Sequence, residues 1–362
     1  MTPESVDERG RTTILLDEPP PLGAAYARAL ARPARVAMGR LLRREHGQAT
    51  AHGEPAGRSG AADPADDHRL TLPAVRYRWP GARVMPDRLA AYREVVHEVA
   101  DGPVPAGYVH VMAFPVAMTL LSRDDFPLPL AGLVHVANAV TVHRAIDPTE
   151  TLTIDAWATD LRPHRRGTQV DVVVEASDGD GATVWEGTST YLARGVRLLD
   201  AGTTGDPTDT EETRAPGAGT GTDGRGDGEP SFPLPTARWE LGADVGRRYA
   251  RVSGDVNPIH LSPLTAKMFG FPRTIAHGMY TASRALAAVG REHGDAFTWT
   301  VGLARPVLLP GAVAVSVRRD QGSGAAPAKT PGTWVYEGWD PVRGTPHFRG
   351  DVTPLDQHPD LR

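Results

Sequence analysis

Apolar residues recur at helical spacing in two stretches of the first half of the chain. Residues 88–100 carry an apolar stripe along one face, which predicts an amphipathic helix. Residues 108–121 are apolar on almost every side, as is typical of a helix that other elements enclose. Pro115 falls inside this second stretch, where we expect it to kink the helix.

The segments around these two helices have the composition of strands. One short segment, 74–79, precedes them, and four segments rich in Val, Thr and Trp follow, each bounded by turn residues: 133–142, 151–160, 168–175 and 182–192. Residues 178–181 read DGDG, and glycine accepts the positive φ that a tight hairpin turn demands. The four segments are therefore predicted to be consecutive antiparallel strands.

The second half of the chain repeats this order. It is predicted to contain a strand, a helix, an enclosed helix and further strands, at 237–241, 245–252, 279–289, 297–304, 311–319, 332–339 and near 347–352. Setting Tyr92 beside Tyr249 aligns RLAAYREVVHE with GADVGRRYARVSGD, which favours an old duplication. One apolar helix wrapped by a curved antiparallel sheet, occurring twice, is an α+β arrangement.

Glycine and proline are concentrated in segments with almost nothing to bury. The two residue types contribute 39 and 33 of 362 residues, about a fifth of the chain. Before the first linker, apolar residues at helical spacing predict a small helical extension. The predicted organisation is a helical extension, a linker, a first domain, a disordered linker and a second domain, at 1–44, 45–70, 71–200, 201–230 and 231–356.

Charge and residue usage exclude several classes of function. A formal net charge of −5 lacks the positive field that attracts nucleic acid. The absence of cysteine excludes disulfides, thiolate nucleophiles and Cys-ligated metal centres. No apolar run approaches the length of a membrane span, and no signal-type apolar core follows the amino terminus. We expect a cytoplasmic protein without nucleic-acid or membrane partners.

The densest group of chemically active residues is 249–260, which reads YARVSGDVNPIH. Asp255 and His260 lie five positions apart across Asn257 and Pro258, and proline favours an extended or turn backbone here, so a loop presents both side chains to one spot. A carboxylate and an imidazole that share a water can move the protons needed to hydrate or dehydrate a carbon–carbon double bond. Asn257 is placed to hold that water or orient the histidine, and Ser253 is a candidate local cap.

Twenty residues further on, the second enclosed helix begins with His277 and Gly278. Unpaired backbone N–H groups and the helix dipole at such a start both favour developing negative charge, which suits a thioester enolate. His277 is expected to fix the loop more than to perform chemistry. Tyr249 shares a helical face with Val245 and Val252 and is expected in the core.

The pattern SGDxNPxH at 253–260, followed by AHGM at 276–279, resembles the hydratase-2 motif of the MaoC-like enoyl-thioester hydratases and (3R)-hydroxyacyl-thioester dehydratases. The resemblance covers residues 74–355. It implies a double hot dog fold in which a half without the motif precedes a half that carries it. It also implies that Asp255 and His260 are the catalytic pair, that Asn257 assists them, and that the Gly278 N–H receives the thioester oxygen.

By this resemblance the chain is a hydro-lyase of fatty acid metabolism that acts on coenzyme A or acyl-carrier-protein thioesters and uses no cofactor. A hot dog thioesterase is the first alternative, although residues 279–289 carry none of the acids that such enzymes place on the central helix. A non-catalytic acyl-thioester-binding subunit is the second. The protein is expected to be a monomer or a homodimer.

The first half departs from the motif. The positions that correspond to the catalytic pair hold Glu98 and Pro103, so an acid is left without a histidine. We predict one active site per chain, with the first half lending a groove for the acyl tail or the pantetheine arm. Candidate phosphate contacts, chosen by charge and nearness to the motif, are Lys267, Arg273 and Arg305.

Other motif matches carry no function. Residues 219–224 fit GxGxxG, but neither a strand nor a helix flanks them, and RGD at 225–227 lies in the same linker. The calcium-loop likeness of 178–186 fails because its flanks are strands. The 13 histidines are scattered without a metal-ligand spacing, so no metal is expected.

Overall fold

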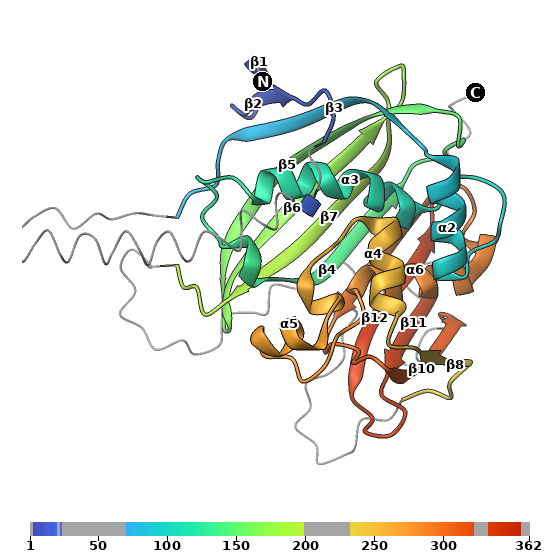
Figure 1. Cartoon of the computed structure of the whole chain (residues 1–362). Coiled ribbons are helices and arrows are strands. Elements are labelled where there is room, and N and C mark those ends of the chain that lie inside the picture. Colours follow the sequence, from blue (N-terminus) through green and yellow to red (C-terminus); the bar gives the residue numbers. More distant parts are fainter. Residues whose placement is uncertain (1–2, 20–21, 24–69, 199–231, 322–331, 356–362) are drawn as a thin grey trace, which may run out of the picture.

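The computed structural model describes residues 3–19, 22–23, 70–198, 232–321 and 332–355. In this part of the chain the strands form a single sheet of 12 members (Figure 1). The first half (71–200) contributes β3 (Val75–Arg83), α2 (Pro86–Val96), α3 (Ala106–Leu121), η1 (Leu130–Gly132), β4 (Leu133–Val142), β5 (Thr151–His164), β6 (Gly167–Ser177) and β7 (Thr183–Arg194).

The second half (231–356) follows the same plan. It contributes β8 (Ala237–Leu241), α4 (Val245–Ser253), η2 (Pro258–His260), α5 (Pro263–Met268), α6 (Gly278–Val289), η3 (Gly290–His293), β9 (Phe297–Leu303), β10 (Gly311–Arg319), β11 (Trp334–Trp339) and β12 (Pro346–Pro354). The strand orders β3-β5-β6-β7-β4 and β8-β10-β11-β12-β9 are the same when each half is numbered along the chain. The expected double hot dog is confirmed, with α3 and α6 as its central helices.

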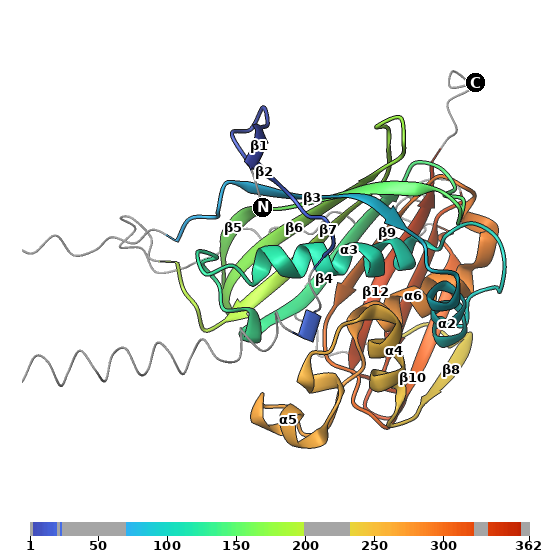
Figure 2. The same ribbon diagram turned by 45° about the horizontal axis from the view of Figure 1, so that its top comes forward.

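The two half-sheets are joined by antiparallel pairing of β4 with β9, with residues running from Ala137 opposite Gly302 to Val142 opposite Phe297. Figure 2 shows α3 lying across the strands of the first half, with α4 and α6 beside the second. Contacts of α2 with α4 and α6, and of α3 with α4, close the helical layer across the seam. The loop that follows α4 is thereby held against the first half.

The enclosed helix of the first half is the centre of its core. Nearly all of α3 is buried, including Val109, Val116 and Leu120 at 0% exposure, because the curved sheet covers its apolar side chains. Pro115 lies inside α3 without ending it, and the Thr119 hydroxyl donates to its carbonyl at 2.8 Å. The all-round apolar pattern is thus explained by enclosure.

Two expectations differ from the structure. The helix predicted over 88–100 ends at Val96, since His97 adopts a left-handed φ of 60°, and Val99 is 49% exposed. The helical extension predicted over 1–44 is wrong for its first part, where β1 (Pro3–Val6) and β2 (Thr12–Leu15) form strands. The reason is tertiary, because the open edge of β3 offers backbone partners to β2.

Residues 24–44 of the predicted extension lie outside the described residues. So do 45–69 of the first predicted linker and all of the second, 201–230. Among the described helices, none is both long and apolar enough to span a membrane.

Candidate active site

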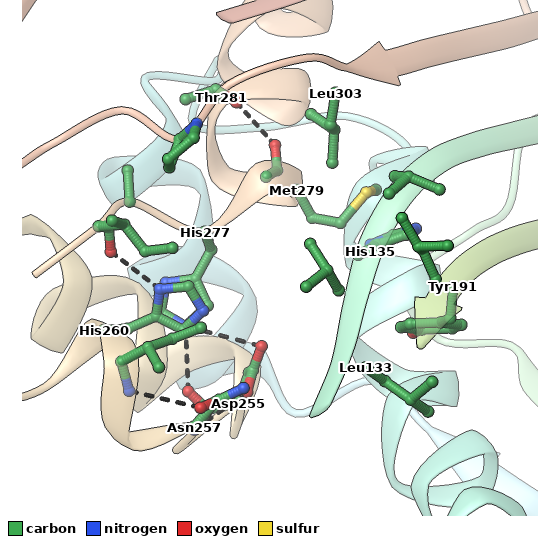
Figure 3. A pocket seen from close by; sticks show the side chains of 18 of the residues that line it. Leu133, His135, Tyr191, Asp255, Asn257, His260, His277, Met279, Thr281 and Leu303 are labelled. Atoms are coloured by element: carbon green, nitrogen blue, oxygen red, sulfur yellow. Dashed lines mark hydrogen bonds and ion pairs between the residues drawn. The ribbon is translucent and has the colours of Figure 1, made fainter. Parts of the chain in front are cut away.

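A cavity of about 720 Å³ lies where the two halves meet. The first half lines it from α3, β4, β7 and the β5–β6 turn, and the second half from the 253–260 loop and the start of α6. Figure 3 shows the motif residues on one side of this space and side chains of β4 and β7 on the other. All six residues predicted for catalysis or thioester binding line it: Ser253, Asp255, Asn257, His260, His277 and Gly278.

The loop that carries the motif is shaped by its own short side chains. Gly254 ends α4 with a left-handed φ of 75°, which L-residues adopt with strain. The Asp255 N–H donates to the Ser253 hydroxyl at 3.1 Å, and the Asn257 N–H donates to Asp255 Oδ1 at 3.1 Å. These local bonds turn the Asp255 carboxylate toward the cavity while it stays 20% exposed.

His260 is held in one tautomer. Its ring is buried at 7% exposure, and Nδ1 lies 2.8 Å from the carbonyl of Ile275. A carbonyl only accepts, so Nδ1 carries the proton and Nε2 keeps a lone pair. Burial lowers the pKa of His260 against the opposing effects of Asp255 and the Ile275 carbonyl, so the imidazole stays in its base form near neutral pH.

His277 braces both members of the pair. Its Nε2–H donates to the Asp255 backbone carbonyl at 3.1 Å and lies 3.7 Å from Asp255 Oδ2 (Figure 3). Its ring stacks on His260 with centroids 3.6 Å apart. Burial and the neighbouring His260 lower its pKa to about 3, so the two stacked rings are both neutral. His277 thus contacts the backbone of the motif loop, and its loop-fixing role remains a prediction.

Gly278 opens α6 on the same wall. A Cβ at this position would lie 2.3 Å from Leu303 Cδ1, so glycine allows the helix start and β9 to approach each other closely. α6 spans 12 residues, and no side chain caps its first turn by a hydrogen bond. Its first N–H groups are thus left without a side-chain partner at a helix start that lines the cavity, and such groups are suited to a developing anion.

The three predicted phosphate contacts separate in the structure. Arg305 lines the cavity. Lys267 and Arg273 are exposed outside the lining, and the Arg273 guanidinium donates to the Pro310 carbonyl at 3.0 Å. Proximity in sequence to the motif did not bring these two cations to the cavity, because α5 and the segment after it turn them outward.

The counterpart of this loop in the first half contains a different centre. Arg93 is buried at 7% exposure and donates to the carbonyls of Ala100, Gly102 and Pro103 at 2.7, 2.7 and 2.9 Å. The cavity beside Glu98 measures about 70 Å³, a tenth of the other. An arginine thus organises this loop where the second half uses an acid and a histidine.

Sequence reasoning missed the cavity's polar side chains from the first half. His110 of α3, His135 of β4 and Tyr191 of β7 all line it, and Arg165, Arg166 and Arg194 line its end near the β5–β6 turn. The alternation of apolar and polar residues along each strand predicts which face of the sheet is inward. It does not predict that the motif of the second half lies opposite that face. Strand pairing between β4 and β9 decides that.

Asp255, His260 and His277 also form the one group of possible metal ligands found among the described residues, with one donor atom each within 4.8 Å of the others. The two rings are stacked with centroids 3.6 Å apart and planes 24° apart, and His260 Nδ1 and His277 Nε2 are committed to backbone carbonyls. This donor set suits acid–base chemistry better than chelation, in which lone pairs converge on one point.

A neutral imidazole and a carboxylate beside a helix start, at the seam of two hot dog units, place the molecule among the hot dog hydratases and dehydratases. The family profile described as "MaoC like domain" matches residues 232–328. The 3-hydroxyacyl-thioester dehydratase X of Mycobacterium tuberculosis is 33% identical over 270 residues, which cover 75% of this chain and 86% of that protein. The chain belongs to the MaoC-like dehydratase family.

Solved structures agree with this assignment. The crystal structure of the mycobacterial HtdX superposes with a TM-score of 0.61 at 30% identity, covering 77% of this chain and all of that one. A MaoC-like dehydratase from Phytophthora capsici, at 20% identity, shares the fold with a TM-score of 0.55 over 81% of this chain and 99% of that one. A short stretch of 39 residues is 51% identical to the peroxisomal enoyl-CoA hydratase 2 of Arabidopsis thaliana, 11% of this chain and 13% of that protein.

Proposed function

We propose that this hydro-lyase interconverts trans-2-enoyl thioesters and (3R)-3-hydroxyacyl thioesters, with Asp255 and His260 as its acid–base pair. The observation that carries the proposal is the meeting of three groups on one cavity wall: the Asp255 carboxylate, the lone pair on His260 Nε2 and the first N–H groups of α6. The name of the mycobacterial relative, a 3-hydroxyacyl-thioester dehydratase, supports the same reaction.

Hydration begins with a water bound between Asp255 and His260. The water oxygen forms a bond to C3 of the enoyl group, and the proton that it loses passes to the pair. The electrons of the C2–C3 double bond move into the thioester, giving an enolate. C2 then takes a proton back from the pair, so one water is added and the enzyme is unchanged. Dehydration follows the same steps in reverse.

Two features of the structure lower the barrier to this reaction. The enolate oxygen is placed at the Gly278 N–H, where the dipole of α6 stabilises negative charge. Burial lowers the pKa of His260 and so supplies an imidazole that accepts a proton at neutral pH. The Asn257 side-chain oxygen accepts a hydrogen bond from the Ile259 N–H at 3.4 Å. This bond stabilises the loop between Asp255 and His260, so Asn257 assists by keeping the pair in place.

The substrate is an acyl thioester of the coenzyme A type, and an acyl-carrier-protein thioester offers the same reacting carbons. Arg305 at the cavity is the proposed phosphate contact for the group that carries the acyl chain, whether this is coenzyme A or the acyl carrier protein. A thioesterase on this fold would need a carboxylate on the central helix, and neither α3 nor α6 carries one. The absence of Asp and Glu from both helices favours the lyase.

The test is hydration of crotonyl-CoA, which is measured as the loss of the enoyl-thioester absorbance. Asp255→Asn and His260→Ala should each reduce kcat by at least about 100-fold in protein that remains folded. Glu98→Gln, the isosteric change at the corresponding place of the first half, is the matched control and should retain full activity. Activity of either site variant within a few-fold of the wild type would refute the assignment, and release of free thiol would indicate a thioesterase.

A further inference from the structure

Three polar aromatic rings from the first half line the cavity opposite the motif. His135 lies between the other two, 6.1 Å from His110 and 4.9 Å from Tyr191 between ring centroids, with interplanar angles of 9° and 22°. The charge of Asp255 contributes to the pKa of all three, so they lie within electrostatic reach of the catalytic carboxylate. None of them belongs to the motif.

The two histidines have hydrogen-bonding capacity that the described part of the chain leaves unused. Nε2 of His135 is shielded from solvent and has no partner there. The backbone of Ala137 opposes the effect of burial on the pKa of His135. Nε2 of a neutral imidazole either donates or accepts a hydrogen bond, so a ligand that reaches into the cavity can supply the missing partner.

Both imidazoles are neutral at physiological pH, because burial lowers the pKa of His110 to about 3 and that of His135 to about 4. Each therefore offers one donor and one acceptor. A hydroxyl group matches this pair, since it both donates and accepts and so can bond His135 Nε2 and a nitrogen of His110 together. A carboxylate does not, because neutral rings leave its charge unpaired close to Asp255.

The surroundings of the two histidines indicate which part of a thioester reaches them. Val111, Phe114 and Met118 follow His110 along α3, and Leu133 precedes His135 on β4, and all of them line the same cavity. These apolar walls suit an acyl chain, whereas the arginines of the lining, Arg305 from the second half and Arg165, Arg166 and Arg194 near the β5–β6 turn, suit a phosphate-bearing group. An acyl arm that runs from the motif along the apolar wall of α3 and β4 passes His110 and His135.

We propose that His110, His135 and Tyr191 form a subsite for a hydroxyl group on the acyl arm, beyond the reacting C2 and C3. This inference rests on the proposed function, since it places the arm by the position of Asp255 and His260. It makes the preferred substrates hydroxylated acyl thioesters rather than plain saturated-tail ones. The preference arises because an imidazole buried against an unsubstituted chain would lose its hydrogen bonds to water without replacement.

The experiment compares kcat/KM for trans-2-octenoyl-CoA with its analogues hydroxylated at C5, C6 or C7. The wild type should prefer at least one hydroxylated analogue by about tenfold or more. His110→Phe and His135→Phe keep an aromatic ring in the stack and should each bring that ratio down to about one. Met118→Leu, a change on the same wall without a polar group, should leave the ratio as it is.

A wild-type ratio near one for every analogue would overturn the proposal, as would a loss in the Phe variants that is equal for plain and hydroxylated chains. The same assays with N-acetylcysteamine thioesters, which lack most of coenzyme A, test whether the rings bind the coenzyme A part of the substrate. If the Phe variants lose kcat/KM only with coenzyme A thioesters, and equally with and without the hydroxyl, then these rings bind coenzyme A and the proposal is wrong. Failure of the proposed reaction itself gives a different result, with no enoyl thioester hydrated at all.

Discussion

Gly246 of α4 is predicted to control the position of His260, although it touches no substrate. A Cβ at position 246 would lie 2.3 Å from the carbonyl oxygen of His260, well inside the 3.4 Å at which ordinary contacts begin. The obstacle is backbone, so a rotamer change cannot relieve it. Gly246→Ala must therefore push the backbone of His260 away from α4 by about 1 Å.

The magnitude follows from what that shift does to the imidazole. Nδ1 of His260 bonds the Ile275 carbonyl at 2.8 Å, and a displacement of about 1 Å takes this pair beyond hydrogen-bond range. Misplacing a catalytic group by this distance costs on the order of 100-fold in rate, or about 2.7 kcal/mol. Overpacking adds a loss of about 1–3 kcal/mol in the free energy of unfolding.

The assay is steady-state hydration of crotonyl-CoA, with the melting temperature measured on the same preparations. Gly302→Ala is the matched control, because its nearest neighbour would be the Arg349 carbonyl oxygen at 3.8 Å, an ordinary contact. Gly246→Ala should lose kcat while remaining folded, and Gly302→Ala should lose neither. A folded Gly246→Ala protein with kcat within threefold of the wild type would refute the claim that α4 positions His260.

Three further predictions concern the pH dependence of rate and stability and the buried arginine. Because burial lowers the pKa of His260, kcat/KM should stay level as the pH falls through 6.5 and decline only below it; a midpoint at or above 6.5 contradicts this. The pKa of His277 is about 3 in the fold, whereas an unfolded histidine takes up its proton near 6.5, so the contribution of His277 to the free energy of unfolding should fall as the pH falls, by about 1.4 kcal/mol per unit between pH 6 and 5. Urea denaturation checks this, and His277→Asn should flatten the slope by the same amount. Arg93→Met leaves three carbonyls without their donor and should lower the free energy of unfolding by about 3 kcal/mol, with a far smaller effect on kcat; full stability would show that these bonds contribute nothing.

Much of the fold could be predicted because the relevant signals are local. The predicted strands 133–142 and 311–319 have the bounds of β4 and β10, since turn residues frame an alternation that one sheet face imposes. The all-round apolar stretch identified α3 as enclosed. Strand β2 was missed because its partner is the edge of β3, about sixty residues away along the chain, and β1 in turn pairs with β2.

The candidate site divides in the same way. Ser253, Asp255 and Asn257 could be placed together from sequence, because they bond one another across two residues and their geometry needs little beyond their own loop. Lys267 and Arg273 looked equally near, but a short helix turns them outward. His110 and His135 could not be predicted for the site, because no local pattern connects either residue to Asp255.

By itself, then, the sequence determined the duplicated order of elements, the motif loop and the single pairing of an acid with a histidine, all of which depend on residues within a few turns of one another. Only the tertiary structure decided what faces that loop. Pairing of β4 with β9 joins the half-sheets across more than 150 residues and sets one face of the first half opposite the motif. Side chains so far apart meet through backbone pairing and core packing, and these leave no periodic trace in the sequence.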